Sequence, residues 1–202
     1  MIPATVSIPA LPAALTWDGA PATSTITADD ALTITAPGAT DLFRDPQGQS
    51  TQHNAPRLLF LPHAQFTLSA RVTVDFQSTY DAGVLLLYVH DTVWAKLCFE
   101  LSPQHQPMIV SVVTNDRSDD CNSVILDRHD VYLRITSLAN AFAFHYSLDN
   151  AMWRLVRYFA LPDTAGVRAG FAAQSPTGTT CRVTFDTIRY APSSVSDIRS
   201  GV

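Results

Sequence analysis

The chain has 202 residues, of which 47% are hydrophobic and 15% charged, and its net charge at pH 7 is −5. This composition supports a sizeable core and excludes a disordered chain, and the length suits one all-β domain. The 13 basic residues are scattered, so neither nucleic acid nor an anionic membrane surface is expected as a partner.

The first segment, residues 1–17, carries no charged side chain before Trp17. Pro3, Pro9 and Pro12 would break the helix of a signal peptide, and the positive segment that precedes such a helix is missing. No other run is long and apolar enough to span a bilayer. We predict an extended N-terminal arm over residues 1–14 that packs against the domain.

Short β-rich runs recur about every ten residues between positions 15 and 191, a spacing typical of a β-sandwich or barrel. Apolar and polar residues alternate clearly in residues 66–75 and 142–148. Residues 148–159 also fit the apolar stripe of a helix. We favour a strand there, because Asp149 and Asn150 suit a tight hairpin turn.

The segment "YDAGVLLLYVHDTVWAKLCFE", residues 80–100, contains two apolar runs separated by "HDT". We predict two antiparallel strands. The first is apolar throughout and therefore needs cover on both faces. In the second, Trp94, Lys96 and Glu100 lie at even spacing and share one face.

Polar residues of later strands are expected to meet this face. The candidates are Tyr132, Arg134, His145 and Arg157. One interpretation is a structural charge network, since unpaired buried charges are costly. The other is a ligand-binding face with Trp94 as a stacking platform. In both, Glu100 should pair with Lys96 or an arginine, so Glu100→Gln should lower the stability by about 1–3 kcal/mol.

Motifs that bind cofactors or metals are absent: there is no phosphate loop, no G-x-G-x-x-G, no H-E-x-x-H and no Cys-x-x-Cys. We therefore predict no cofactor and no metal. The acidic segment "NDRSDDCNS", residues 115–123, lacks the spacing and the glycine of an EF-hand loop and indicates a solvated turn. The segment "GATDLFRDPQG", which contains Asp41, predicts a charged turn that could cap a sheet face.

The cysteines give information about the compartment. Cys98, Cys121 and Cys181 are an odd number without metal-binding spacing, and the chain has no Asn-x-Ser/Thr acceptor. Both facts favour reduced thiols and the cytosol, with a Cys121–Cys181 disulfide as the alternative.

Six segments stand in a characteristic order along the chain. They are "LTWDGAP", "TDLFRDPQG", "YDAGVLLLYVHDTVWAKLCFE", "SVVTNDRSDD", "YSLDNAMWRLVRYF" and "AGFAAQSPTGTTCRVTFDTI". On these segments, residues 15–191 resemble the regulation-of-enolase family of fungi and its bacterial relatives of unknown function. The resemblance implies an all-β, concanavalin A-like jelly-roll sandwich of two antiparallel sheets, one of them concave. Residues 192–202 would form a polar, frayed tail.

The motif residues of the family match this chain position by position. The matched residues are Asp41, Tyr80, Asp81, Gly83, Trp94, Lys96, Glu100, Ser118, Asp119, Trp153 and Arg157. The chain departs from the pattern at Asp120, where the family often has an aromatic residue, and at Asn150, where it has a glycine. Asparagine tolerates the same positive φ, so the hairpin is expected to remain.

The resemblance implies no established reaction, and a fold does not imply a function. Our leading hypothesis is a non-catalytic cytosolic domain, with a regulatory role in carbohydrate metabolism, that binds a carbohydrate-like ligand or a metabolic partner protein through its concave face. The residues expected in this site are Trp94, Lys96, Glu100, Arg134, His145, Arg157, Asp41 and Asp81. The main alternative is a glycoside hydrolase that uses Glu100 with Asp41 or Asp81. A purely structural domain is the third, and the sequence leaves the oligomeric state open.

Overall fold

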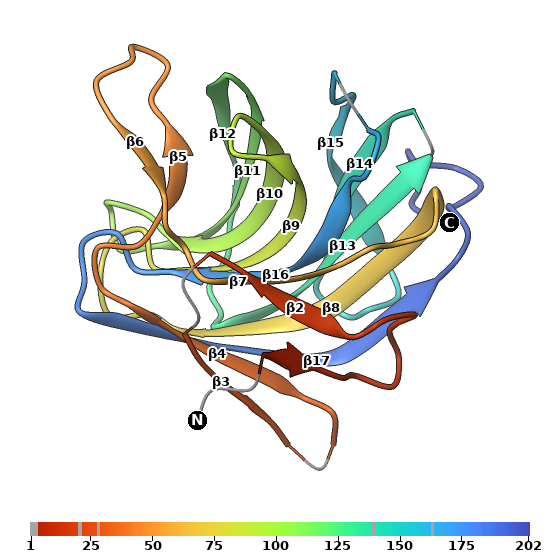
Figure 1. Ribbon diagram of the computed structural model, residues 1–202, viewed down its shortest axis with the longest axis horizontal. Coiled ribbons are helices and arrows are strands. Elements are labelled where there is room, and N and C mark those ends of the chain that lie inside the picture. The colour runs from red at the N-terminus through yellow and green to blue at the C-terminus, as the bar shows by residue number, and fades with distance from the viewer. Residues whose placement is uncertain (1–3, 20–21, 28, 139, 163) are drawn as a thin grey trace.

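The computed structural model describes residues 4–19, 22–27, 29–138, 140–162 and 164–202. Within these ranges the chain forms strands and no helix (Figure 1). Two large antiparallel sheets pack face to face as a jelly-roll sandwich, as the sequence predicted.

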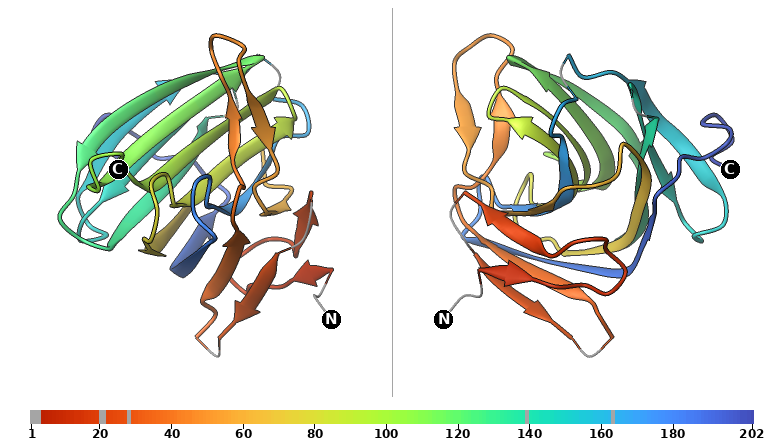
Figure 2. Two further views of the ribbon diagram at one scale, coloured as in Figure 1. Left: turned by 90° about the vertical axis from the view of Figure 1, so that its left-hand side faces the viewer. Right: turned by 45° about the vertical axis from the view of Figure 1, so that its right-hand side comes forward.

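The larger sheet has eight strands in the described residues. Their order is β1 (Thr5–Val6), β2 (Leu15–Asp18), β7 (Arg57–Phe60), β16 (Arg168–Gln174), β9 (Ala82–His90), β10 (Val93–Leu101), β11 (Pro107–Asn115) and β12 (Arg117–Ile125). The sheet is strongly curved (Figure 2).

The second sheet has seven strands in the same ranges. Their order is β15 (Trp153–Phe159), β14 (Phe142–Ser147), β13 (Asp130–Leu138), β8 (Gln65–Asp75), β17 (Thr180–Ala191), β4 (Leu32–Pro37) and β3 (Thr23–Ile26). A separate hairpin of β5 (Leu42–Arg44) and β6 (Thr51–His53) stands up from the sandwich beside the curved strands (Figures 1 and 2).

The core lies between the two large sheets and follows the predicted alternation. In β8 the residues that enter the core are Phe66, Leu68, Ala70, Val72 and Val74. The sheets approach closely at Gly83, where a Cβ atom would lie 2.5 Å from Val72 and 2.6 Å from Val183 of the opposite sheet. A side chain at position 83 would therefore push the two sheets apart.

Strands β9 and β10 confirm the interpretation of residues 80–100. They pair antiparallel, and a turn at Asp91 and Thr92 joins them. Leu85 and Leu87 of β9 enter the core, whereas Val84 and Leu86 pack into a second apolar cluster on the other side of the sheet. Both faces of this apolar strand are covered, as expected.

Residues 148–159 form a hairpin and a strand. Asn150 has a φ of 60° in the turn, and β15 follows it. The strand prediction was correct, because asparagine adopts the positive φ that this hairpin requires.

The acidic segment at residues 115–123 was predicted as a turn, and that prediction was wrong. The turn is confined to the residues around Asp116, which has a φ of 62°, and the chain returns from Arg117 as the edge strand β12. An edge strand exposes much of its surface, so polar side chains there do not distinguish a strand from a loop.

The two ends of the chain pack against the sandwich. Val6, Ile8 and Leu11 of the N-terminal arm are buried in the core, as predicted for an arm that packs against the domain. The frayed tail was a wrong prediction, since the backbone carbonyls of Ile198 and Gly201 contact His145 and Arg134.

Candidate functional site

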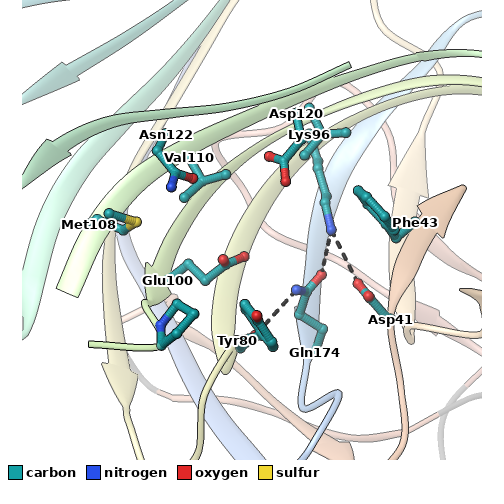
Figure 3. A pocket seen from close by; sticks show the side chains of 12 residues that line it. Asp41, Phe43, Tyr80, Lys96, Glu100, Met108, Val110, Asp120, Asn122 and Gln174 are labelled. Atoms are coloured by element: carbon teal, nitrogen blue, oxygen red, sulfur yellow. Dashed lines mark hydrogen bonds and ion pairs between the residues drawn. The ribbon is translucent and has the colours of Figure 1, made fainter. Parts of the chain in front are cut away.

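A cavity of about 390 Å³ opens on the outer face of the eight-stranded sheet, which is the face turned away from the core. Figure 3 shows side chains that point into it from the segments around β5 and Tyr80 and from strands β10, β11, β12 and β16. They are Asp41, Phe43, Tyr80, Lys96, Glu100, Pro103, Met108, Val110, Val112, Asp120, Asn122 and Gln174.

Alternation along the strands places the cavity residues. Ala95, Leu97 and Phe99 of β10 enter the core, so Lys96 and Glu100 point to the outer face. Lys96 lies opposite Val112 of β11, which lies opposite Asp120 of β12, and cross-strand partners share a face. The segment around β5 adds Asp41 and Phe43 from the side.

Lys96 is the buried cation of the site, with only 3% of its surface exposed. Its ammonium donates to the Asp41 carboxylate at 3.2 Å and to the Gln174 side-chain oxygen at 3.0 Å. Burial is the largest single effect on Lys96 and lowers its pKa, but the charge of Asp41, the neighbouring Cys98 and Glu100 and the hydrogen bond to Asp41 together raise the pKa above its ordinary value. Lys96 is therefore charged, and two of the three N–H donors of its ammonium bind acceptors within the protein.

Glu100 has no ion pair or hydrogen bond within the described part of the chain, although it faces the same cavity. The predicted pairing with Lys96 or an arginine was wrong, because Asp41 takes up the ammonium. Burial raises the pKa of Glu100 to about 8, against the opposing charge of Lys96, and the charges of Asp120 and Asp41 add to the rise. At neutral pH the group is largely a neutral carboxylic acid that can donate one hydrogen bond.

Asp120 stands at the rim of the cavity. Loss of solvent around its carboxyl raises its pKa, and the charges of Asp41 and Asp119 add to this effect. Three carboxyl groups thus face one buried lysine, so the lining does not favour an anionic ligand.

Tyr80 adopts an unusual backbone conformation at the mouth of the cavity. Its φ is 68°, in the left-handed region that bulky residues rarely occupy. Its N–H donates to the carbonyl of Leu101, and its own carbonyl accepts from the Gln174 amide. These bonds hold the ring at the mouth with 40% of its surface exposed, and such held strain is typical of functional sites.

Among the residues that the sequence assigned to the site, the structure brings Asp41, Lys96 and Glu100 together. Trp94 shares their strand face but is fully buried in the cluster that contains Leu42 and Ala55. Trp94 does not line the cavity, so the geometry does not support a stacking platform: Trp94 is a packing residue covered by the segment after Asp41.

Asp81 and Arg157 lie away from the cavity in structural positions. Asp81 is buried and accepts hydrogen bonds from the N–H groups of Gln77 and Ser78 and from the Ser175 hydroxyl. Arg157 of β15 pairs with Asp119 of β12 at 2.8 Å and so connects the edge strands of the two sheets.

Arg134 and His145 lie on the outer face of the other sheet. Their strand neighbours Leu133, Ile135 and Phe144 enter the core, so both polar side chains point away from it. The sandwich therefore separates these two residues from the cavity.

Sequence reasoning missed Phe43, Asp120, Asn122 and Gln174 as lining residues and treated Tyr80 only as part of a turn. The tyrosine that begins "YDAG", residues 80–83, was a usable signal, since a turn has no packing need for a tyrosine. Gln174 had no signal, because it reaches the site from a strand that is distant in sequence.

No group of three or more His, Cys, Asp or Glu residues in the described ranges could hold a metal ion. No helix in those ranges could cross a membrane. The three cysteines are free thiols, with Cys98 and Cys181 buried and Cys121 exposed.

The fold and the cavity define an antiparallel β-sandwich with a site of mixed apolar and polar lining on the outer face of its curved sheet. Residues 17–193 match the family described as "Protein of unknown function (DUF1349)", and the chain belongs to this family. It is 28% identical over 155 residues to Regulation of enolase protein 1 of Saccharomyces cerevisiae, covering 76% of this chain and 78% of the yeast protein.

Solved structures share the fold. A functionally unknown protein from Saccharomyces cerevisiae has a TM-score of 0.80 and 26% identity, over 88% of this chain and 95% of the other. A xylan beta-1,4-xylosidase from Bacillus halodurans has a TM-score of 0.62 and 15% identity, but the match covers 80% of this chain and 32% of the enzyme. A bifunctional GH43-CE protein from Bacteroides eggerthii has a TM-score of 0.69 and 17% identity, and the match covers 92% of this chain and 24% of that protein. These two similarities concern one part of each enzyme and carry only the fold.

Proposed function

We propose that the protein is a non-catalytic binding domain that takes a small, neutral, carbohydrate-like ligand into the cavity on the outer face of the eight-stranded sheet. One observation carries the proposal: an exposed tyrosine ring and a carboxyl group without a partner, Tyr80 and Glu100, face the same cavity of about 390 Å³. Aromatic rings stack on the apolar faces of sugars, and carboxyl groups exchange hydrogen bonds with hydroxyls.

The rest of the lining fits such a ligand. Val110, Val112 and Met108 provide an apolar floor, and Asn122 and Asp120 add polar atoms at one side. Small-molecule sites are commonly apolar cavities of about 300–1,000 Å³ with a few convergent polar groups. The excess of carboxyl groups over cations favours a neutral ligand over a phosphorylated one.

Tyr80 supplies the decisive variant. A glycan array and a panel of neutral sugars should identify a ligand for the parent, and titration calorimetry should show that Tyr80→Ala weakens its binding by about tenfold or more. Tyr158→Ala is the matched control, because this tyrosine is 51% exposed on β15, outside the lining. Equal binding by the parent and Tyr80→Ala would reject the cavity as the site.

Trp94→Ala separates packing from binding. The side chain is fully buried, so its truncation should lower the free energy of unfolding by about 3–5 kcal/mol in a urea titration. A variant with unchanged stability but no ligand binding would instead show that Trp94 contacts the ligand.

A second candidate is a glycoside hydrolase. The observation in its favour is the raised pKa of Glu100, about 8, which suits a general acid near a second carboxyl group, Asp120. Asp41 is paired with Lys96 and Asp81 supports a turn, so neither is free to act as the second group. Hydrolysis of aryl glycosides or oligosaccharides by the parent, lost in Glu100→Gln, would favour the enzyme over the binding domain.

The name of the yeast relative suggests a regulatory role and an enzyme of carbohydrate metabolism as partner. The cavity and a protein partner are compatible if the ligand modulates the contact. Free cysteines and the missing glycosylation acceptor favour the cytosol for such a role. Co-migration with a purified glycolytic enzyme in size-exclusion chromatography, with and without the identified sugar, tests this extension.

A further inference from the structure

We propose that the outer face of the seven-stranded sheet carries a second, independent site, which binds a small oxyanion through Arg134 and Arg189. The ligand class is a phosphate or a carboxylate group. This site lies across the sandwich from the cavity described above and does not depend on the proposed sugar binding.

The residues of this site form one row across four adjacent strands. Arg189 of β17 lies opposite Ser69 of β8, Ser69 lies opposite Arg134 of β13, and Arg134 lies opposite His145 of β14. Cross-strand partners share a face, so the sheet register itself places two guanidinium groups on either side of a serine hydroxyl. We call these four residues the basic row.

The basic row has no acidic partner in the described ranges. No ion pair there involves Arg134 or Arg189, whereas the neighbouring Arg71 pairs with Asp186 at 2.8 Å. Arg134 is only 6% exposed, and burying a cation without a counter-charge is costly. Burial without a compensating charge lowers the pKa of Arg134 to about 10.

The Nε–H donor of Arg134 remains unused. It is buried without a hydrogen-bond partner, as is the hydroxyl of Thr136 in the next row. The unpartnered Nδ1 of His145 is an acceptor, because the Nε2–H of this neutral ring donates to the carbonyl of Ile198. The Arg134 guanidinium otherwise rests 4.1 Å from the centre of the Trp153 ring and donates to the carbonyl of Gly201 at 2.8 Å. These neutral contacts hold the cation in place but leave its charge unbalanced.

A cavity of about 340 Å³ opens at the row. Its lining includes Thr67, Ser69, Arg134, Asn150, Trp153 and Arg189, and no acidic residue contributes to it. Hydroxyl, amide and guanidinium groups together are the usual donors to phosphate and carboxylate oxygens, with arginine matching their geometry in pairs of bonds. The chemistry of the lining is thus the opposite of that of the cavity on the other sheet.

The plain alternative is that Arg134 only anchors the turn of residues 197–202. That turn contacts Arg134 and His145 through the carbonyls of Gly201 and Ile198, but within the described range 164–202 no hydrogen bond connects it to Arg189. Arg189 therefore distinguishes the two roles, because an anchor for the turn does not need a second arginine on the row.

The test uses the full chain with inorganic phosphate as the probe and a dicarboxylate, succinate, as a second arm. Phosphate should bind with a dissociation constant of about 1 mM or below by calorimetry, and Arg189→Gln should weaken it by about tenfold or more. The matched control is Arg182→Gln, an exposed arginine on the same strand that lies outside the basic row. Tyr80→Ala should bind phosphate as the parent does.

Each outcome decides one question. Preference for phosphate or for succinate identifies which oxyanion the row recognises. Absence of binding to both, or equal weakening by Arg182→Gln and Arg189→Gln, would overturn the proposal. Loss of phosphate binding in Tyr80→Ala would also overturn it, because the anion would then occupy the other cavity.

Discussion

Two buried cations, Lys96 and Arg134, lie on the outer faces of the two sheets, with 3% and 6% of their surfaces exposed. Lys96 has a carboxylate at 3.2 Å, and this charge raises its pKa. Arg134 has a tryptophan ring and a backbone carbonyl, and burial lowers its pKa to about 10. The same strand geometry thus supports one compensated and one uncompensated cation.

The difference between them shows what each face can still bind. On the eight-stranded sheet Asp41 balances the charge of the buried cation. The group that remains available to a ligand there is the carboxyl of Glu100. On the seven-stranded sheet the group that remains available to a ligand is the guanidinium of Arg134. A buried charged residue therefore indicates a ligand only when its partners within the chain are counted.

The largest expected effect comes from removing the charge that compensates Lys96. Asp41→Asn leaves the buried ammonium without a counter-charge and should lower the free energy of unfolding by about 3 kcal/mol. Urea denaturation followed by tryptophan fluorescence measures it. The control is Asp116→Asn, which breaks a pair whose carboxylate is 74% exposed and should cost less than about 0.5 kcal/mol. Similar losses in both variants would mean that Lys96 does not depend on Asp41.

A smaller, pH-dependent effect is expected at Glu100. Its folded-state pKa of about 8 exceeds the ordinary value of 4.5, so the folded protein binds more protons between these pH values. The free energy of unfolding should then fall as the pH rises through this window. Glu100→Gln should remove this decline. At the upper end of the pH window its free energy of unfolding should exceed that of the parent by about 1 kcal/mol or more, which is the equivalent of one pKa unit.

This expectation reverses the destabilisation of about 1–3 kcal/mol that a paired Glu100 would have implied. Thermal melts of parent and variant at a series of pH values measure it. Parallel profiles for the two proteins would show that Glu100 titrates normally.

The smallest effect is expected at the uncompensated cation. Arg134→Met removes one hydrogen bond and a ring contact but leaves no stranded charge behind, so the loss should be about 1 kcal/mol. The same urea titration applies. A loss of stability as large as that of Asp41→Asn would contradict the contrast between the two cations, because it would show that contacts other than these neutral ones stabilise Arg134.

Much of the fold could be predicted from local patterns. Alternation in β8 and β14, the apolar run of β9 and the Asn150 turn each specify the structure that forms, because side-chain period and turn chemistry act over a few residues. The edge strand β12 escaped prediction, since it buries little and so lacks an apolar period.

The candidate site was predictable only along one strand. Lys96 and Glu100 share a face by spacing alone, but their partners come from the segment near β5 and from the end of β16. The predicted positions of Arg134, His145 and Trp94 in the site were wrong for a related reason. Alternation identifies which residues of a strand share a face, but only the fold determines which face is covered and by which elements.

The acidic edge strand β12 has a consequence for how copies of the protein meet. It is the last strand of its sheet, and its exposed side chains include Asp119, Asp120 and Asn122. An unpaired edge can recruit the same edge of another molecule and extend the sheet from copy to copy. Two such edges would bring carboxylates of equal charge together, so this side of the sandwich resists aggregation while it supplies Asp120 to the cavity.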